Sequence, residues 1–114
     1  MKILVGGALG RMGREVQLAA RQSGSSIVYG VDLLGSGSTD FPCCTSFAAL
    51  PQPIEADVLI DFSNPSALEE LLAFAVAQKL PCVLCATGYT EAQLAAIARA
   101  AETVPVLRLF FCAC

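Results

Sequence analysis

The chain has 114 residues, a length that suits one compact domain. Hydrophobic residues make up 55% of it and charged residues 15%, a balance that excludes an intrinsically disordered chain. With seven basic residues and a formal net charge of −3, it lacks the clustered Lys and Arg that nucleic acids or anionic membranes require. No apolar run reaches the roughly 18 residues that span a bilayer, and the run at the N-terminus stops at Arg11, short of a signal-peptide pattern. We therefore expect a soluble, cytoplasmic protein that binds neither nucleic acid nor membrane.

The side-chain inventory also limits the chemistry. There is no histidine, which removes Ser-His-Asp and Cys-His nucleophile pairs. The six cysteines are Cys43, Cys44, Cys82, Cys85, Cys112 and Cys114. Cys82 and Cys85 have the CxxC spacing of redox and zinc sites, but they lie in an apolar run typical of a buried strand, which points them to opposite faces. Buried free thiols are the favoured interpretation, and no metal site is expected.

Hydrophobic periodicity alternates between strand and helix along the chain. The predicted strands, all short and apolar, are 2–6, 26–31, 57–61, 81–86 and 104–109. The predicted helices are 11–23, a segment that begins at 64–65 and keeps an apolar stripe to residue 76, and 90–102. Residues 33–53, rich in Gly, Ser, Pro and Cys, are predicted to form a connection with one helical turn near 46–50.

Local signals predict the ends of these helices. Gly24 closes the first helix, because glycine tolerates a positive φ. Asn64 and Pro65 provide a cap and a first-turn proline for the second helix. Thr90 and Gln93 have the spacing of a capping box at the start of the third. The apolar positions of the first helix, at helical spacing, are Met12, Val16, Ala19 and Ala20.

Continuous apolar strands separated by helices indicate a parallel sheet covered on both faces. Right-handed crossovers then give an α/β fold with a doubly wound parallel sheet of the Rossmann type. We assign residues 1–108 to this single domain, expect no second, substrate-binding domain, and treat 109–114 as a divergent apolar tail. Because such a tail leaves an apolar edge strand uncovered, we expect the isolated chain to be poorly soluble.

A cluster of glycines joins the first predicted strand to the first helix. Gly7, Gly10 and Gly13 have the spacing G-x-x-G-x-x-G. Such glycines permit a tight turn, let the backbone approach a pyrophosphate and let the helix pack closely on the strand. Asp32 follows the second strand, about 20 residues further on, where a carboxylate binds the ribose of a dinucleotide. A structural turn and a solvated acid are the alternatives, but the strand, glycines, helix and acid together favour nucleotide binding.

Two more turns, which begin at Asp61 and Cys85, follow strands at the same edge of the predicted sheet. Ser63 and Thr87 are either ligand contacts or turn residues. Asp61 is either catalytic or a loop acid that bonds local backbone amides. Tyr89 either stacks on a ligand ring or covers the sheet edge. Because dinucleotides bind outside the carboxyl ends of parallel strands, both turns belong to the candidate crevice.

Three segments carry a resemblance to a known family. They are Gly7-Ala8-Leu9-Gly10-Arg11-Met12-Gly13, Asp61-Phe62-Ser63-Asn64-Pro65-Ser66-Ala67 and Ala86-Thr87-Gly88-Tyr89. In this order they resemble the N-terminal domain of the 4-hydroxy-tetrahydrodipicolinate reductase (dihydrodipicolinate reductase) family, over about residues 1–108. The resemblance implies a reductase that uses NADPH or NADH on the cyclic precursor in the diaminopimelate route to lysine. It also implies a homotetramer assembled through a second domain.

The resemblance places the cofactor along the three turns. It implies that residues 7–12 hold the pyrophosphate, that Arg11 reaches a ribose 2′-phosphate and that Asp32 binds the ribose hydroxyls. The implied cofactor-binding residues are Gly7, Ala8, Leu9, Gly10, Arg11, Met12, Gly13, Asp32, Phe62, Ser63, Cys85, Ala86, Thr87 and Gly88. NADPH and NADH both stay open, because Asp32 is followed by Leu33 rather than by a basic residue, and its carboxylate repels a 2′-phosphate.

The chain departs from the family pattern in two places. Ala86 stands where the family's turn beside the nicotinamide carries a threonine. After Arg108 the family continues through a hinge into a domain whose His/Lys-rich motif binds and protonates the substrate, whereas this chain has residues 109–114 and no histidine. We therefore assign no catalytic residue, interpret the chain as truncated relative to the family and do not expect it alone to be a competent reductase. The alternatives are a stand-alone dinucleotide-binding module, another Rossmann oxidoreductase, and a non-functional product that keeps half of a fold.

Overall fold

The computed structural model describes residues 1–34 and 39–109, and most of the predicted tail therefore lies outside the described residues. Its centre is one six-stranded sheet in the order β3-β2-β1-β4-β5-β6, in which every neighbouring pair is parallel. The strands are β1 Lys2–Gly6, β2 Ser26–Val31, β3 Cys43–Cys44, β4 Val58–Asp61, β5 Cys82–Leu84 and β6 Val106–Arg108. This order reverses direction between β1 and β4, as in a doubly wound dinucleotide-binding sheet.

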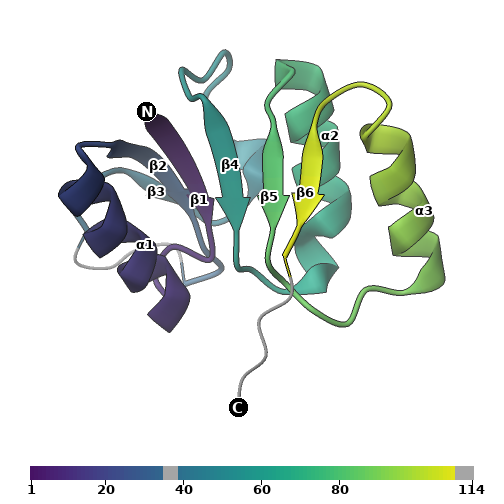
Figure 1. The fold of residues 1–114 in the computed structure, drawn as a ribbon, viewed down its shortest axis with the longest axis horizontal. Helices are drawn as coiled ribbons and strands as arrows, with labels where there is room; N and C mark the ends of the chain where they lie inside the picture. The colour runs from purple at the N-terminus through teal and green to yellow at the C-terminus, as the bar shows by residue number, and fades with distance from the viewer. Residues whose placement is uncertain (35–38, 110–114) are drawn as a thin grey trace.

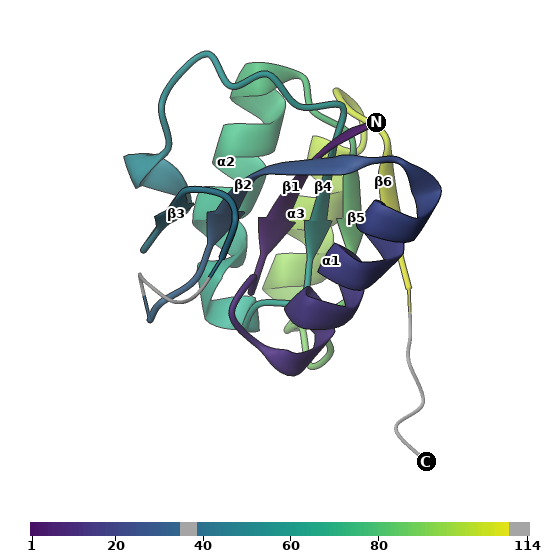
Figure 2. The ribbon, with the colours of Figure 1, turned by 90° about the vertical axis from the view of Figure 1, so that its left-hand side faces the viewer.

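Helices lie on both faces of the sheet (Figures 1 and 2), as the sequence predicts. The α-helices are α1 Arg11–Ser23, α2 Leu68–Gln78 and α3 Glu91–Ala100. Two short 3₁₀ helices are η1 Phe47–Ala49 and η2 Pro65–Ala67. Figure 2 shows α1 on one side of the strands and α2 with α3 on the other. The predicted Rossmann-type architecture is confirmed.

The two faces of the sheet build two separate cores. On β1, Leu4 faces the large core beneath α2 and α3, and it has no exposed surface. Ile3 and Val5 point the other way, into a smaller core with Ala20 of α1. Alternate side chains on one strand are therefore both buried, which explains why the strand is apolar throughout rather than at every second residue.

The apolar side of α1 differs from the predicted one. Gly13 and Ala20 are buried and Val16 is half-buried, but Met12 and Ala19 are exposed. Gly13 lies so close to the preceding turn that the glycine, and not Met12, forms the contact. The prediction that Met12 and Ala19 belong to the apolar stripe is wrong, because the side of α1 that faces the sheet runs through Gly13, Val16 and Ala20.

The helix ends follow the sequence signals closely. Gly24 has φ 76° and its N–H reaches the last carbonyls of α1. The Thr90 hydroxyl accepts from Gln93 N at 3.1 Å, while Gln93 Oε1 accepts from Thr90 N at 2.9 Å, and this capping box opens α3. Asn64 accepts from Ser66 N at 3.0 Å, and so caps η2, the 3₁₀ turn that leads into α2.

The described part of the chain contains four of the six cysteines. Cys43, Cys44, Cys82 and Cys85 are free thiols. The described residues hold no group of three or more Cys, Asp or Glu side chains that could bind a metal ion. Within residues 1–34 and 39–109, no helix is long and apolar enough to cross a membrane.

Candidate functional site

The carboxyl ends of the parallel strands meet at one edge of the sheet, toward which the arrowheads of β4, β5 and β6 point in Figure 1. The turn after β1, the acid after β2 and the turns after β4 and β5 all leave this edge. Because β1 and β4 are neighbours at the centre, the glycine turn lies beside the turn that begins at Asp61. The structure thus brings together the four segments that the sequence analysis assigned to one crevice.

The glycine turn is tied to the end of β2. Gly7 has φ +76° and donates its N–H to the Val31 carbonyl at 2.7 Å, and Ala8 N donates to the same oxygen at 3.3 Å. Gly10 N donates back to the Gly7 carbonyl at 3.2 Å. These bonds hold the chain in a compact turn before α1 begins.

Close approach of neighbouring backbone explains why positions 13 and 7 are glycine. A Cβ atom on Gly13 would lie against the Ala8 carbonyl oxygen and 2.5 Å from the Gly7 carbonyl oxygen, so only glycine lets α1 pack so closely on the turn. A Cβ atom on Gly7 would lie 2.9 Å from the Phe62 carbonyl carbon. The turns after β1 and β4 therefore touch backbone to backbone.

The N-terminus of α1 is suited to an anion. Its first helical bond runs from Arg14 N to the Gly10 carbonyl at 3.1 Å, so the three amides of residues 11–13 have no helical acceptor. Gly10 offers no side chain to cap them, and the first turn of α1 contains no acidic residue. Free amides at the positive end of a helix are the usual protein contribution to a pyrophosphate site.

Asp32 is held beside this turn. Its Oδ2 accepts from Leu9 N at 2.9 Å and its Oδ1 accepts from Leu34 N at 3.0 Å. The side chain is half-buried, and so keeps lone pairs on the solvent side of the crevice. The carboxylate is thereby fixed next to the glycine turn, at the distance along the chain that the dinucleotide pattern requires.

Asp61 lies deeper, at the end of β4. It is 2% exposed, and its Oδ1 accepts from Ser63 N at 3.2 Å and from Ser63 Oγ at 2.5 Å. Burial raises the pKa of this carboxyl above its ordinary value, and the two hydrogen bonds from Ser63 partly offset the increase. The sequence analysis left Asp61 either as a catalytic residue or as an acid that bonds its own loop. The structure shows the hydrogen bonds to its own loop.

The turn after β5 combines buried and exposed residues. Cys85 is buried and donates its N–H to the Asp61 carbonyl at 2.9 Å, whereas Thr87 and Gly88 are exposed. Burial, together with the Asp61 charge, raises the pKa of Cys85 to about 11 and that of Cys82 to about 12. Thiols with such pKa values stay protonated and are poor nucleophiles, which argues against a redox role for the CxxC spacing.

Tyr89 turns inward beside this loop. Its hydroxyl is buried and finds no hydrogen-bond partner in the described part of the chain. The Arg108 guanidinium carbon lies 5.9 Å from its ring centroid, a cation–π distance. Burial, followed by the Asp61 charge, raises the pKa of Tyr89 to about 12. Tyr89 is half-buried and packs against the core at the sheet edge.

One residue of the site was missed by the sequence analysis. Gly30, within β2, has the Cβ of Ala8 so near that a Cβ of its own would lie 2.8 Å from it. Gly30 in β2 therefore leaves the space that Ala8 of the glycine turn occupies. A glycine inside a strand pattern is a signal of such close approach.

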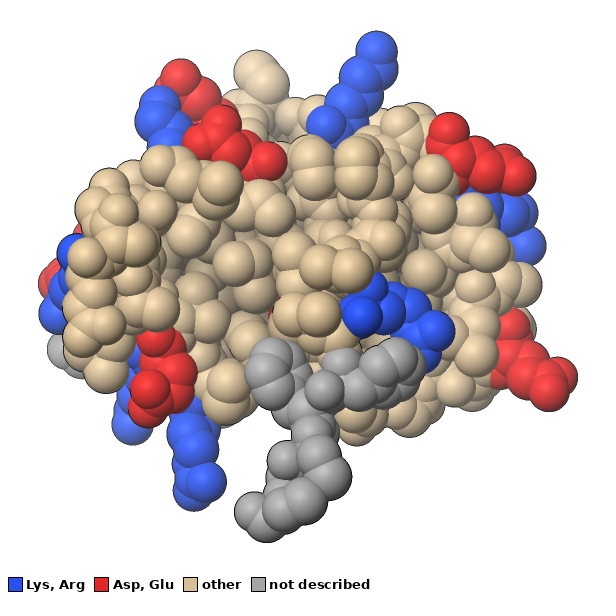
Figure 3. Space-filling model, viewed as in Figure 1, with Lys and Arg blue, Asp and Glu red and all other residues tan. Residues whose placement is uncertain are grey.

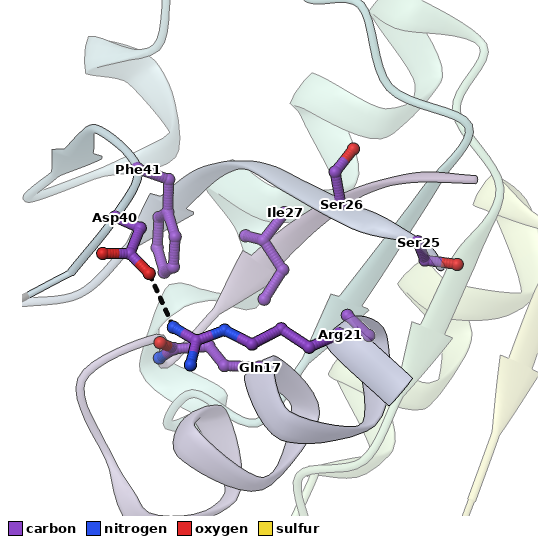
Figure 4. Close-up of a pocket in the computed structure, with 8 residues that line it drawn as sticks. Gln17, Arg21, Ser25, Ser26, Ile27, Asp40 and Phe41 are labelled. Atoms are coloured by element: carbon purple, nitrogen blue, oxygen red, sulfur yellow. Dashed lines mark hydrogen bonds and ion pairs between the residues drawn. The ribbon is translucent and has the colours of Figure 1, made fainter. Parts of the chain in front are cut away.

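The described residues also line hollows away from the candidate crevice, such as one of about 510 Å³ between α2 and α3 that is lined by Leu72, Val76 and Ala96. Figure 3 shows few, scattered charged side chains on the viewed face and no broad basic patch. Residues of α1, the start of β2 and Phe41 line another hollow (Figure 4), of about 280 Å³, and the Arg21 and Asp40 side chains in its lining form an ion pair of 2.6 Å. It lies toward the opposite end of the strands, because it includes Ser25 and Ser26, where β2 begins.

A parallel sheet in this order, with a glycine turn, an open helix N-terminus and an acid after β2, defines a Rossmann-like nucleotide-binding domain of the kind found in oxidoreductases. The family model described as "Dihydrodipicolinate reductase, N-terminus" matches residues 1–109, and the chain belongs to this family. The resemblance stated from the three sequence segments is confirmed.

Individual relatives agree with this assignment. The 4-hydroxy-tetrahydrodipicolinate reductase of Clostridium tetani is 33% identical over 109 residues, which are 95% of this chain and 42% of the relative. The chain thus spans about two fifths of the length of the curated relatives that it matches.

Two solved structures share the fold. The dipicolinate-bound dihydrodipicolinate reductase from Paenisporosarcina sp. TG-14 superposes with a TM-score of 0.71 at 24% identity, over 90% of this chain and 43% of that one. The WlbA dehydrogenase from Thermus thermophilus, in complex with NAD and α-ketoglutarate, superposes with a TM-score of 0.72 at 11% identity, over 97% of this chain and 41% of that one.

Proposed function

We propose that this chain is the dinucleotide-binding part of a reductase that transfers hydride from NADH or NADPH to 4-hydroxy-tetrahydrodipicolinate. The family supports the reaction class, and the NAD-bound structural neighbour supports a nicotinamide cofactor. The observation that carries the proposal is the set of three amides at the start of α1, which have no helical acceptor and lie beside a fixed Asp32 carboxylate. The bound cofactor would supply the hydride, and the chain's share is to bind and orient it.

Each part of the crevice has a proposed role. The amides of residues 7–13 hold the pyrophosphate, aided by the dipole of α1. The Asp32 carboxylate accepts hydrogen bonds from the adenosine ribose. The turns at 62–63 and 85–88 flank the nicotinamide half. The exposed Thr87 is the hydroxyl that remains in the latter turn, since the neighbouring Ala86 has none.

NADH is the favoured cofactor. Two backbone amides fix the Asp32 carboxylate, so it cannot swing away from a bulky anion. The next residues, Leu33 and Leu34, are 80% and 75% exposed and supply no positive charge. A ribose 2′-phosphate would meet this carboxylate at close range, which disfavours NADPH. Arg11, at the start of α1, is the side chain that would offset this repulsion.

The test is a fluorescence titration of the folded chain with NADH and NADPH. Gly10→Asp adds a negative charge where the pyrophosphate is proposed to bind, yet aspartate is a favoured N-cap and should not harm the fold. We expect this variant to lose at least about tenfold in affinity from charge repulsion alone. The matched control is Ser26→Asp, which adds the same charge to an exposed residue at the start of β2, at the opposite end of the strands.

Three results would contradict the proposal. A folded wild-type chain that binds neither dinucleotide would refute the binding function. Equal binding by the Gly10→Asp variant would place the ligand elsewhere. Tighter binding of NADPH than of NADH would refute the preference, and loss of NADPH binding in Arg11→Ala would then identify the side chain that offsets Asp32.

A further inference from the structure

Asp61 is the one charged side chain that is buried in the described part of the chain. A carboxylate in the interior is unfavourable unless hydrogen bonds compensate for the lost water. It ends β4, the strand between β1 and β5, and so stands at the centre of the sheet edge beneath the candidate crevice. Packing alone does not explain a buried carboxyl group at the centre of this sheet edge.

The bonds of Asp61 join three turns. Its carboxylate closes the turn after β4 by accepting both the N–H and the hydroxyl of Ser63. Its own carbonyl accepts from Cys85 N at 2.9 Å, at the start of the turn after β5. The next residue, Phe62, donates its N–H to the Gly6 carbonyl at 2.9 Å, at the start of the glycine turn.

The glycine turn rests directly on this arrangement. A Cβ on Gly6 would collide with Asp61 Oδ1, and a Cβ on Gly7 would lie 3.0 Å from Ser63 N. The two bare glycines therefore lie against the Asp61–Ser63 turn without any side chain between them. A shift of that turn is transmitted to the backbone amides that follow Gly7.

We propose that Asp61 is a positioning residue for the dinucleotide site, whose two hydrogen bonds from Ser63 hold the 61–63 turn against Gly7 and so fix the glycine turn. The inference rests on the proposed function, because the glycine turn is the part assigned to the pyrophosphate. Asp61 acts through the protein's own amides and touches no ligand. Its geometry, and not its charge, is the property that matters.

Three variants separate geometry from charge. Asp61→Asn keeps an oxygen that accepts both bonds from Ser63 and removes the charge. Asp61→Ala removes the acceptor. Ser63→Ala keeps the backbone bond and removes the hydroxyl. The matched control is Asp57→Ala. Asp57 is an exposed aspartate that directly precedes β4, at the opposite end of the strand from Asp61, and it accepts a hydrogen bond from Lys2 N at 2.7 Å.

The first measurement is the NADH dissociation constant of each folded variant. We expect Asp61→Ala to weaken binding at least about tenfold, since small displacements of binding groups have large effects. Ser63→Ala should lie between Asp61→Ala and wild type. Asp61→Asn should bind at least as tightly as wild type, because it also removes a negative charge beneath a bound pyrophosphate. Asp57→Ala should match wild type within about twofold.

The second measurement needs no ligand. Amide hydrogen exchange of Gly7 and Ser63 should accelerate in Asp61→Ala and not in Asp61→Asn, while exchange of the buried Leu59 amide stays unchanged in both. If Asp61→Ala does not fold, the comparison of Ser63→Ala with Asp61→Asn decides in its place.

The outcomes separate this inference from the proposed function. If the wild-type chain binds NADH and Asp61→Ala binds it equally well, the role of Asp61 is refuted and the proposed function stands. Asp61→Asn as weak as Asp61→Ala, with both folded, shows that charge or a proton is required and also overturns it. A wild-type chain that binds neither dinucleotide refutes the proposed function, and with it any role of Asp61 in binding. The exchange rates of Gly7 and Ser63 would then still show whether Asp61 orders the turn.

Discussion

Substituting Gly13 by alanine should destabilise the fold although alanine is the better helix former. The new Cβ would lie 2.5 Å from the Gly7 carbonyl oxygen, whereas ordinary contacts begin at 3.4 Å, so α1 or the turn must move by about 0.9 Å. Both partners are backbone, and the Gly7 N–H is bonded to Val31, so the turn cannot yield freely. Overpacking of this kind costs about 3 kcal/mol at the upper end of its range. The better helix propensity of alanine returns about 1 kcal/mol, which leaves a net loss of about 2 kcal/mol.

Urea unfolding followed by circular dichroism measures this loss. With a denaturant dependence of about 1.5 kcal/mol/M for a chain of this size, the midpoint of Gly13→Ala should fall by roughly 1.3 M. Gly10→Ala is the matched control, because its Cβ would meet nothing nearer than 3.5 Å and its φ of −82° suits any residue. Its midpoint should stay within about 0.3 M of wild type, since the gain in unfolded-state rigidity offsets the weaker cap. Equal midpoints for the two variants would refute the close packing of α1 on the turn.

The remaining predictions concern backbone strain, burial and capping. Gly24→Ala should lower the free energy of unfolding by about 1 kcal/mol because of its positive φ alone. Gly7→Ala should lower it by at least about 1 kcal/mol more, because its Cβ would also meet neighbouring backbone at 2.9 Å. Equal losses for the two variants would show that this backbone contact costs nothing. Burial raises the pKa of Asp61 above its ordinary 3.8, so the stability that its protonation provides is present below that pH and is lost as the pH rises through the folded value. Asp61→Asn should therefore gain stability relative to wild type as the pH rises above 3.8 in urea unfolding, and a difference that does not change with pH would contradict this. Thr90→Ala should lower the free energy of unfolding by about 1 kcal/mol through loss of the bond to Gln93, with a melting temperature lower by about 4 °C; an unchanged melting temperature would show that the capping box contributes nothing.

Much of the fold could be predicted because its signals are local. The β1 strand and α1 begin and end at the expected residues, since an apolar run meets glycines and the helix ends at Gly24. The β3 strand was not predicted. It has two residues, and its existence depends on pairing with β2 through bonds such as Asp32 N to the Cys44 carbonyl at 2.9 Å. Neither cysteine carries a strand pattern of its own, so only the neighbouring strand reveals it.

The candidate site divides in the same way. The glycine spacing could be found in the sequence because the steric need for glycine arises within one turn and the helix that follows it. Asp32 could be found because it directly follows the next strand. The support beneath them could not, because Gly30 and Asp61 meet the glycine turn through the order of strands in the sheet. Strand β4 follows β3 in the chain but pairs with β1, and no local pattern states which strands become neighbours.

Strand order also separates two acids that look alike in the sequence. Asp32 and Asp61 both stand at the end of an apolar strand, and both accept hydrogen bonds from backbone amides. Strand β2 lies toward one side of the sheet, so Asp32 stays half-buried and keeps a face open to the crevice. Strand β4 lies between β1 and β5, so Asp61 is enclosed beneath the glycine turn and could reach a ligand only by displacing it. A carboxylate near the margin is thereby available to a ribose, whereas the one at the centre can act only on the protein's own backbone.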